Sequence, residues 1–153
     1  TFIHRIGEAN KRAALAVGDM WKAVGIEVAI ESNEVKVHYQ RLREKQFEVA
    51  DAGFSAPPDA EFFAYLLRSD SVEINFGGWS NAEYDRLTDE AAGEIDLAKR
   101  GALYQQAERI ALEETALIPV YIPVNRALVQ SWVKGFEMNA VGTHQTRWIT
   151  MER

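Results

Sequence analysis

The chain has no cysteine and few histidines among its 153 residues. The absence of cysteine excludes disulfides, thiolate zinc sites and thiol catalysis. The three histidines, His4, His38 and His144, are far apart and show no ligand spacing such as H-x-x-x-H, so we expect no metal site built on them. No apolar run approaches the roughly 20 residues that a membrane-spanning helix requires.

Positive charge is also scarce. The 17 Lys and Arg residues are outnumbered by 23 Asp and Glu residues, which gives a formal net charge of −6. No stretch rich in Lys and Arg offsets this balance, so the composition argues against a nucleic-acid partner. Hydrophobic residues make up 47% and charged residues 26%, which is typical of a folded globular domain.

The length is enough for one domain with its own core and too short for two comfortable ones. The first residues, Thr1 to Arg5, include no initiator Met and no basic segment followed by an apolar run, so they do not resemble a secretory leader. We therefore expect the chain to be a fragment or a processed product.

Hydrophobic periodicity predicts alternating helices and strands in the first half of the chain. Apolar residues recur at helical spacing over 8–24 and again over 35–44. In residues 26–31 the side chains of one face are all apolar, at positions 26, 28 and 30, and the other face carries Glu27 and Glu31. Residues 47–54 form a second strand-like run. The resulting order, α-β-α-β, favours an α/β fold.

The sequence pattern in the middle of the chain predicts three helices. We expect a short helix over 59–68, a second from Ser80 to Gly93, and a third and longest helix capped by Asp96. Ser80 and Glu83 have the spacing of a capping box, in which each side chain satisfies a free amide at the helix start.

The final third is predicted to contain short strands, at 116–124, 126–133 and 147–151. Pro119 and Pro123 lack the amide hydrogen that a strand donates, so the first of these segments is expected to be peripheral or bent.

None of the candidate catalytic patterns is complete. Ser55 follows Gly53 and Phe54 but lacks the second glycine of a nucleophile elbow, so we interpret it as a loop serine. The pairs Glu113-Glu114 and Asp89-Glu90 are adjacent, and neighbours on a helix point in different directions. Gly77-Gly78 lacks the Lys-Ser/Thr of a phosphate-binding loop. We therefore expect neither an enzyme nor a cofactor site.

Aromatic residues offer a stronger lead, since eight of them lie between Phe47 and Tyr84. Most are expected to pack in the core. Phe54, however, stands at a predicted strand end beside Gly53, where the backbone can approach a ligand closely. Ligands of α/β sheets collect at such ends, so the pattern predicts a pocket there and indicates no reaction.

Several segments, taken in order, resemble a known family. They are Asp19-Met20-Trp21-Lys22, residues 47–54, residues 79–85, residues 103–108, residues 118–121, Leu128-Val129, residues 132–135 and Arg147-Trp148-Ile149. This order resembles the C-terminal portion of the solute-binding proteins of peptide-type ABC importers, the oligopeptide/dipeptide-binding family. The likeness covers nearly all of the chain.

The resemblance implies one lobe of a two-lobed periplasmic-binding-protein fold, which closes on a peptide or small solute outside the cytoplasmic membrane and delivers it to a membrane permease. Residues 1–124 would form the second-lobe α/β domain, a mixed sheet flanked by helices. Residues 125–153 would form a β-rich crossover segment that packs on the first lobe. Without that lobe, we expect the segment's apolar side chains to find cover on this chain or through self-association.

The resemblance also implies a ligand site. Its expected residues are Asp51, Ala52, Gly53, Phe54 and Ser55, with Asp59 nearby. A bound peptide would pair with the backbone around Gly53 as an added strand, and Phe54 would form an aromatic wall where the family usually has Trp.

Two departures from the family bear on the ligand. The family's Asp, which pairs with a peptide's α-amino group, aligns with Pro57, and an Arg common in oligopeptide binders aligns with Asp51. Either Asp59 or Asp51 therefore takes over the ammonium, or the ligand is a non-peptide solute such as an opine. A stand-alone interaction domain derived from such a lobe is a further alternative.

Overall fold

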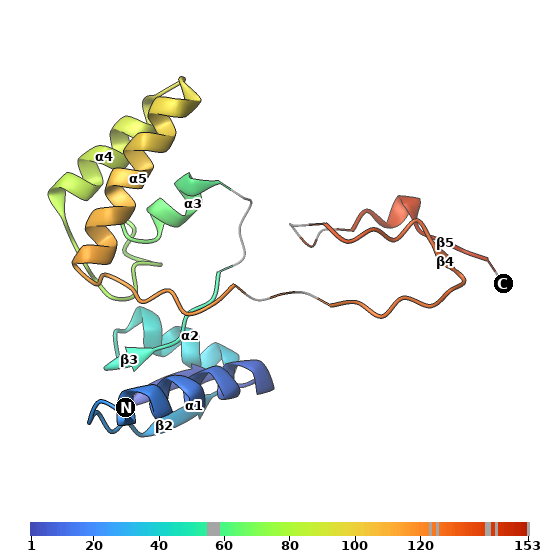
Figure 1. Cartoon of the computed structure of the whole chain (residues 1–153), viewed down its shortest axis with the longest axis horizontal. Coiled ribbons are helices and arrows are strands. Elements are labelled where there is room, and N and C mark those ends of the chain that lie inside the picture. The colour runs from blue at the N-terminus through green and yellow to red at the C-terminus, as the bar shows by residue number, and fades with distance from the viewer. Residues whose placement is uncertain (55–58, 123, 125, 140–141, 143, 153) are drawn as a thin grey trace.

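The computed structural model describes residues 1–54, 59–122, 124, 126–139, 142 and 144–152. Figure 1 shows three groups of elements along the chain: a small sheet with its helices, a group of helices, and a tail that leads away from both. The tail is defined here as residues 117–153.

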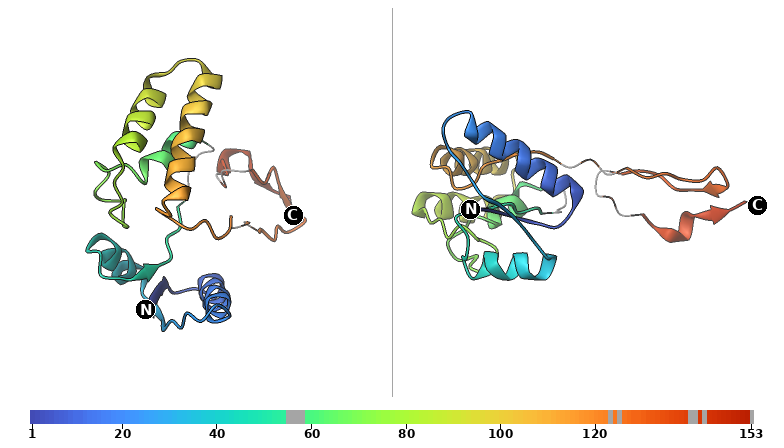
Figure 2. Two further views of the ribbon diagram at one scale, coloured as in Figure 1. Left: turned by 60° about the vertical axis from the view of Figure 1, so that its left-hand side comes forward. Right: turned by 90° about the horizontal axis from the view of Figure 1, so that it is seen from below.

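A parallel sheet of three strands forms the first group. β1 (Phe2–Arg5) is the central strand, between β2 (Ile30–Asn33) and β3 (Val49–Ala50). α1 (Glu8–Lys22) and α2 (Val35–Arg43) lie on opposite sides of these strands (Figure 2). Each helix links two strands that run in the same direction, as parallel pairing requires.

The sequence pattern did not predict β1. Phe2, Ile3 and His4 are all buried, because helices cover both faces of this central strand. A strand buried on both faces shows no alternation of apolar and polar residues, so the periodicity that predicted α-β-α-β missed the strand at its centre.

The helices predicted at 8–24 and 35–44 are confirmed as α1 and α2, whereas the flanking strands are shorter than predicted. Strand pairing of β2 begins at Ile30, opposite Phe2 of β1, so residues 26–29 of the predicted strand lie outside it. On the other side, β1 pairs with β3 only at Val49 and Ala50.

The second group consists of α3 (Ala60–Tyr65), α4 (Ala82–Gly93) and α5 (Leu97–Glu113). Tyr84, Leu87, Ala107 and Ala111 form a buried cluster between α4 and α5. The Tyr84 hydroxyl donates to the Ala64 carbonyl oxygen at 2.7 Å, which ties α4 to α3.

The helix caps only partly match the prediction. Asp96 caps α5 as predicted and accepts from the backbone amides of Ala98 and Lys99 at 2.9 and 3.0 Å. At α4 the cap is Asn81, not Ser80, because the Asn81 side chain accepts from the amides of Glu83 and Tyr84 at 3.0 Å. The predicted capping box is therefore wrong by one residue.

The described residues of the tail carry little regular structure. β4 (Val133–Lys134) pairs antiparallel with β5 (Thr150–Met151), and a single 3-10 turn, η1 (Thr146–Trp148), precedes β5. Within its described residues, 116–124 contains no strand, whereas the segments predicted at 126–133 and 147–151 contribute only their last residues to β4 and β5. At Gly135, φ is 74° and an added Cβ would overlap the Trp148 carbonyl oxygen, so the turn after β4 requires glycine.

The predicted α/β class, with helices flanking a sheet, is confirmed. In the described residues the main sheet is parallel rather than mixed, because helical crossovers connect all of its strands, and antiparallel pairing is confined to the tail. None of the helices in the described part of the chain combines the length and the apolar content needed to cross a membrane.

Candidate functional site

The predicted ligand segment lies at the carboxyl end of the parallel sheet. β1 ends at Arg5, and the neighbouring strand β3 ends at Ala50, after which the chain continues as an extended segment, residues 51–54. Together with Arg5, Tyr39 and Phe76, this segment is called the strand-end site below. Carboxyl ends of parallel strands are where α/β proteins usually bind ligands.

The backbone of this segment is open beyond Asp51. Ala52, Gly53 and Phe54 are exposed, and their amide groups donate no hydrogen bond to another described residue. The Gly53 carbonyl oxygen accepts one long bond, 3.4 Å, from the Tyr39 hydroxyl. Free backbone groups next to an edge strand can pair with an extended ligand without reading its side chains.

Asp51 itself is anchored in the fold. Its amide donates to the Ile3 carbonyl oxygen at 3.0 Å, and its carbonyl oxygen accepts from Nε2 of His38 at 2.8 Å. Its carboxylate oxygen Oδ1 accepts from the Arg5 amide at 3.2 Å and lies 3.2 Å from the same His38 nitrogen. Because a carbonyl oxygen only accepts, the His38 ring carries a proton on Nε2.

His38 is completely buried, and no described residue pairs with its other ring nitrogen, Nδ1. The sequence offered no pattern that linked His38 to Asp51, since the two residues belong to different elements. The structure therefore gives Asp51 the role of fixing the start of the open segment.

Three aromatic rings from separate parts of the chain gather beside the segment. Phe54 stacks on Phe76 with ring centres 6.0 Å apart and planes inclined by 19°. Tyr39 of α2 lies 6.3 Å from Phe76. Phe54 remains 37% exposed, so this cluster presents an apolar wall to solvent.

Arg5 is the residue that the sequence analysis missed. Its Nη1 donates to the Tyr39 hydroxyl at 3.4 Å. Its guanidinium lies against Gly53, where an added Cβ would be 3.1 Å from Nη2. Because β1 was not predicted, nothing in the sequence pattern placed Arg5 at the same sheet edge as Gly53.

Asp59, in contrast, is engaged elsewhere. Its carboxylate caps α3 by accepting from the Glu61 amide at 2.9 Å, and it lies 3.3 Å from Nη2 of Arg100. A ligand ammonium would have to compete with Arg100 for this group. Ser55 and Pro57, the other two positions singled out from the sequence, lie outside the described residues.

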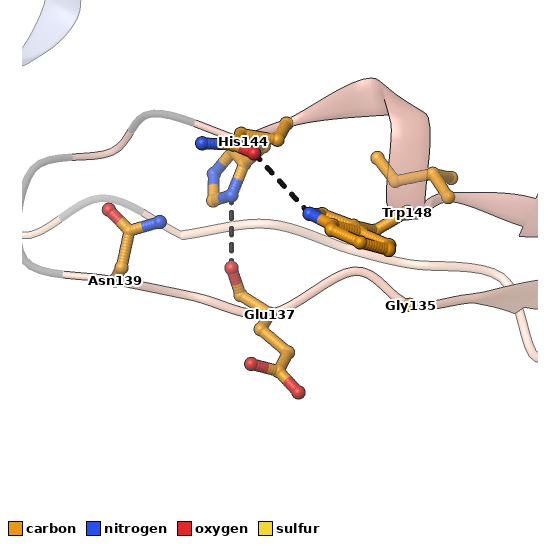
Figure 3. Close-up of a pocket in the computed structure, with 7 residues that line it drawn as sticks. Gly135, Glu137, Asn139, His144 and Trp148 are labelled. Carbon is orange, nitrogen blue, oxygen red and sulfur yellow. Dashed lines mark hydrogen bonds between the residues drawn. The ribbon is translucent and has the colours of Figure 1, made fainter.

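Two hollows lie away from the strand-end site. One, of about 370 Å³, opens between the two arms of the tail that carry β4 and β5. There the Trp148 indole donates to the amide oxygen Oε1 of Gln145 at 3.3 Å (Figure 3). The other, of about 170 Å³, is lined by residues of α3, α4 and α5, including Tyr65 and Tyr104. No group of His, Asp and Glu in the described residues is arranged to hold a metal ion.

Known proteins are similar to this chain in sequence and in fold. The chain is 35% identical over 134 residues to the probable deoxycholate-binding periplasmic protein YgiS of Escherichia coli (strain K12), a match that covers 86% of this chain and 25% of that protein. It is 30% identical over 141 residues to the periplasmic oligopeptide-binding protein OppA of Haemophilus influenzae, covering 89% and 26%. No protein-family model matches the chain.

Solved structures agree with the sequence relatives. Haemophilus influenzae OppA in complex with the peptide RPPGFSPFR superimposes with a TM-score of 0.88 at 28% identity, covering 98% of this chain and 30% of that one. The Escherichia coli murein tripeptide binding protein MppA gives a TM-score of 0.89 at 26% identity, with the same coverage.

The chain is homologous to the oligopeptide-binding family of periplasmic proteins. The resemblance drawn from the sequence is therefore confirmed. The chain spans about a quarter of the length of these relatives. These relatives are named as binding proteins and not as enzymes.

Proposed function

We propose that this chain forms part of the substrate-binding component of a peptide-type ABC importer, which captures a peptide or related small solute in the periplasm and presents it to a membrane permease. The observation that carries the proposal is the open backbone of residues 52–54 at the carboxyl edge of the sheet, in a chain homologous to peptide-binding proteins.

Binding would use the main chain for affinity and the rings for shape. An extended ligand pairs with the amide and carbonyl groups around Gly53, while Phe54 and Phe76 cover its apolar parts. Asp51 holds the register of this segment through its bonds to Ile3 and His38. Of the residues expected from the sequence, Ala52, Gly53 and Phe54 are the ones we assign to direct ligand contact.

The division of the chain also belongs to this proposal. Residues 1–124 would form most of a second lobe, and residues 125–153 would cross back to a first lobe. The accessible surface of the chain is 11270 Å², whereas a compact monomer of its 17.3 kDa mass is expected to expose roughly 7,800 Å². The apolar side chains of the tail account for part of this excess and favour a large covering partner.

No catalytic role is part of the proposal. The relatives are named as binding proteins. Asp51 and Asp59, the two carboxylates expected from the sequence to take a ligand ammonium, are each held by a described neighbour. Closure of two lobes on a solute would couple binding to recognition by the permease.

A non-peptide organic acid is the second candidate ligand. The relative at 35% identity is named as a probable deoxycholate-binding protein. The apolar wall of Phe54 and Phe76 suits a rigid hydrocarbon ligand as well as it suits a peptide. Asp51 and Asp59, which could pair with a peptide's α-amino group, already contact His38 and Arg100.

Mass spectrometry of the small molecules released when the complete native protein is denatured tests both candidates. A mixture of short peptides would support the peptide importer. A single steroid or other organic acid would support the second candidate. Recovery of no bound solute, together with no binding of a tripeptide library or of deoxycholate, would contradict a solute-binding role and favour a stand-alone interaction domain.

A further inference from the structure

We propose that Arg5 binds a carboxylate group of the solute and thereby selects anionic ligands. This inference rests on the proposed function and adds to it a ligand class and a residue. Arg5 lies at the carboxyl end of the central strand, beside the open segment that follows β3.

The guanidinium faces the segment that would take the ligand. Its Nη2 is the closest atom to the position that a Cβ on Gly53 would occupy, at 3.1 Å, and its Cζ is 3.8 Å from the same point. The side chain thus lies along the open backbone, within reach of a ligand group that passes Gly53.

Arg5 is an exception among the partly buried arginines of the described residues. The partly buried arginines in the described residues are Arg5, Arg41, Arg68 and Arg100. Arg41 pairs with Glu31, Arg68 with Asp70 and Asp89, and Arg100 with Asp59 and Glu61. Arg5 forms no ion pair with a described carboxylate, and within the described residues its side chain makes one hydrogen bond, the long one to Tyr39.

The carboxylate of Asp51, in the open segment beside Arg5, does not compensate the charge. Oδ1 of Asp51 accepts from the backbone amide of Arg5 and lies beside the His38 ring, so this oxygen serves the backbone and not the guanidinium. A guanidinium has five donors in a planar fork that matches a carboxylate. Removing such a charge from water without an anionic partner is costly, and a ligand carboxylate would supply that partner.

Two kinds of ligand carry the required group. A peptide has a C-terminal carboxylate, and deoxycholate has a side-chain carboxylate attached to an apolar ring system. In both cases the carboxylate would form a charge-assisted pair with Arg5, while the remainder of the ligand covers the rings of Phe54 and Phe76.

Isothermal titration calorimetry on the complete protein tests the assignment. The probes are the tripeptide Ala-Phe-Ala and its C-terminal amide, and deoxycholate and its neutral carboxamide. We expect the native protein to prefer the free acid of at least one pair. Arg5→Gln should weaken that acid by about tenfold or more, because a charged hydrogen-bonded pair is lost, and should change the amide by less than about twofold.

Two further variants separate charge recognition from folding. Arg12→Gln removes an exposed positive charge on α1 and should leave both forms unaffected. Tyr39→Phe removes the hydroxyl between Arg5 and the Gly53 carbonyl oxygen. It should weaken acid and amide by the same factor and so preserve the preference for the acid.

The possible results are distinct. If the native protein bound both forms equally, or if Arg5→Gln weakened both equally, the assignment of Arg5 would be wrong while the proposed function stood. If the native protein bound neither class of probe in either form, both the assignment and the proposed function would be overturned. A preference confined to one pair identifies the source of the carboxylate.

Discussion

At the scale of single residues, the strand-end site combines a rigid support with an open backbone. His38 and Asp51 are fixed to each other and to the sheet, whereas Ala52, Gly53 and Phe54, which directly follow, leave their amides free. A rigid anchor next to unsatisfied backbone groups reduces the entropy that the site loses when a ligand pairs with it.

Gly53 provides the sharpest test of this arrangement. Gly53→Val would place a branched side chain against the Arg5 guanidinium, 3.1 Å from the new Cβ, and over the backbone that the ligand must approach. We expect the complete protein to lose detectable binding of its released solute by calorimetry. Gly101→Ala, in α5 where an added Cβ meets nothing within 4 Å, is the matched control and should bind normally. Unchanged affinity of Gly53→Val would remove this residue from the site.

At the scale of elements, the sequence predicted what depends on local periodicity and missed what depends on pairing. The helices α1, α2, α4 and α5 were predicted because each has an apolar stripe and clear ends. β1 was missed because burial on both faces removes alternation. Gly53 and Phe54 were placed at a strand end by the pattern of residues 47–54 and in a ligand site by the family resemblance. Arg5 could not be joined to them until the order β2-β1-β3 was known.

The cap of α4 was predicted at Ser80 but lies at Asn81, and the difference can be tested by substitution. Asn81 accepts from two amides at the helix start and donates through Nδ2 to the Glu114 carboxylate at 2.7 Å. Asn81→Ala should lower the free energy of unfolding by about 1–2 kcal/mol, measured by urea denaturation. Ser80→Ala should change it by less than about 0.5 kcal/mol. The reverse ranking would restore the capping box with Ser80.

At the scale of the whole molecule, the tail has apolar side chains that no other described part of this chain covers, Leu128 and Ile122 among them. Figure 1 shows it extending away from the helices and the sheet. Leu128 is completely exposed and Ile122 is 91% exposed. The expectation that apolar side chains of the tail would find cover on this chain is therefore wrong for Leu128, and cover by a first lobe or by a second copy stays a prediction.

Substitution of Leu128 distinguishes a covered tail from a free one. If a first lobe covers it in the complete protein, Leu128→Asp buries an unpaired charge and should lower the free energy of unfolding by about 3 kcal/mol or more, measured by denaturant unfolding. Ile95→Asp is the matched control, because Ile95 is 92% exposed between α4 and α5, on the body of the chain. It should change stability by less than about 0.5 kcal/mol. If both substitutions had equally small effects, Leu128 would remain in solvent. If the loss of stability depended on protein concentration, a second copy of the chain would be what covers Leu128.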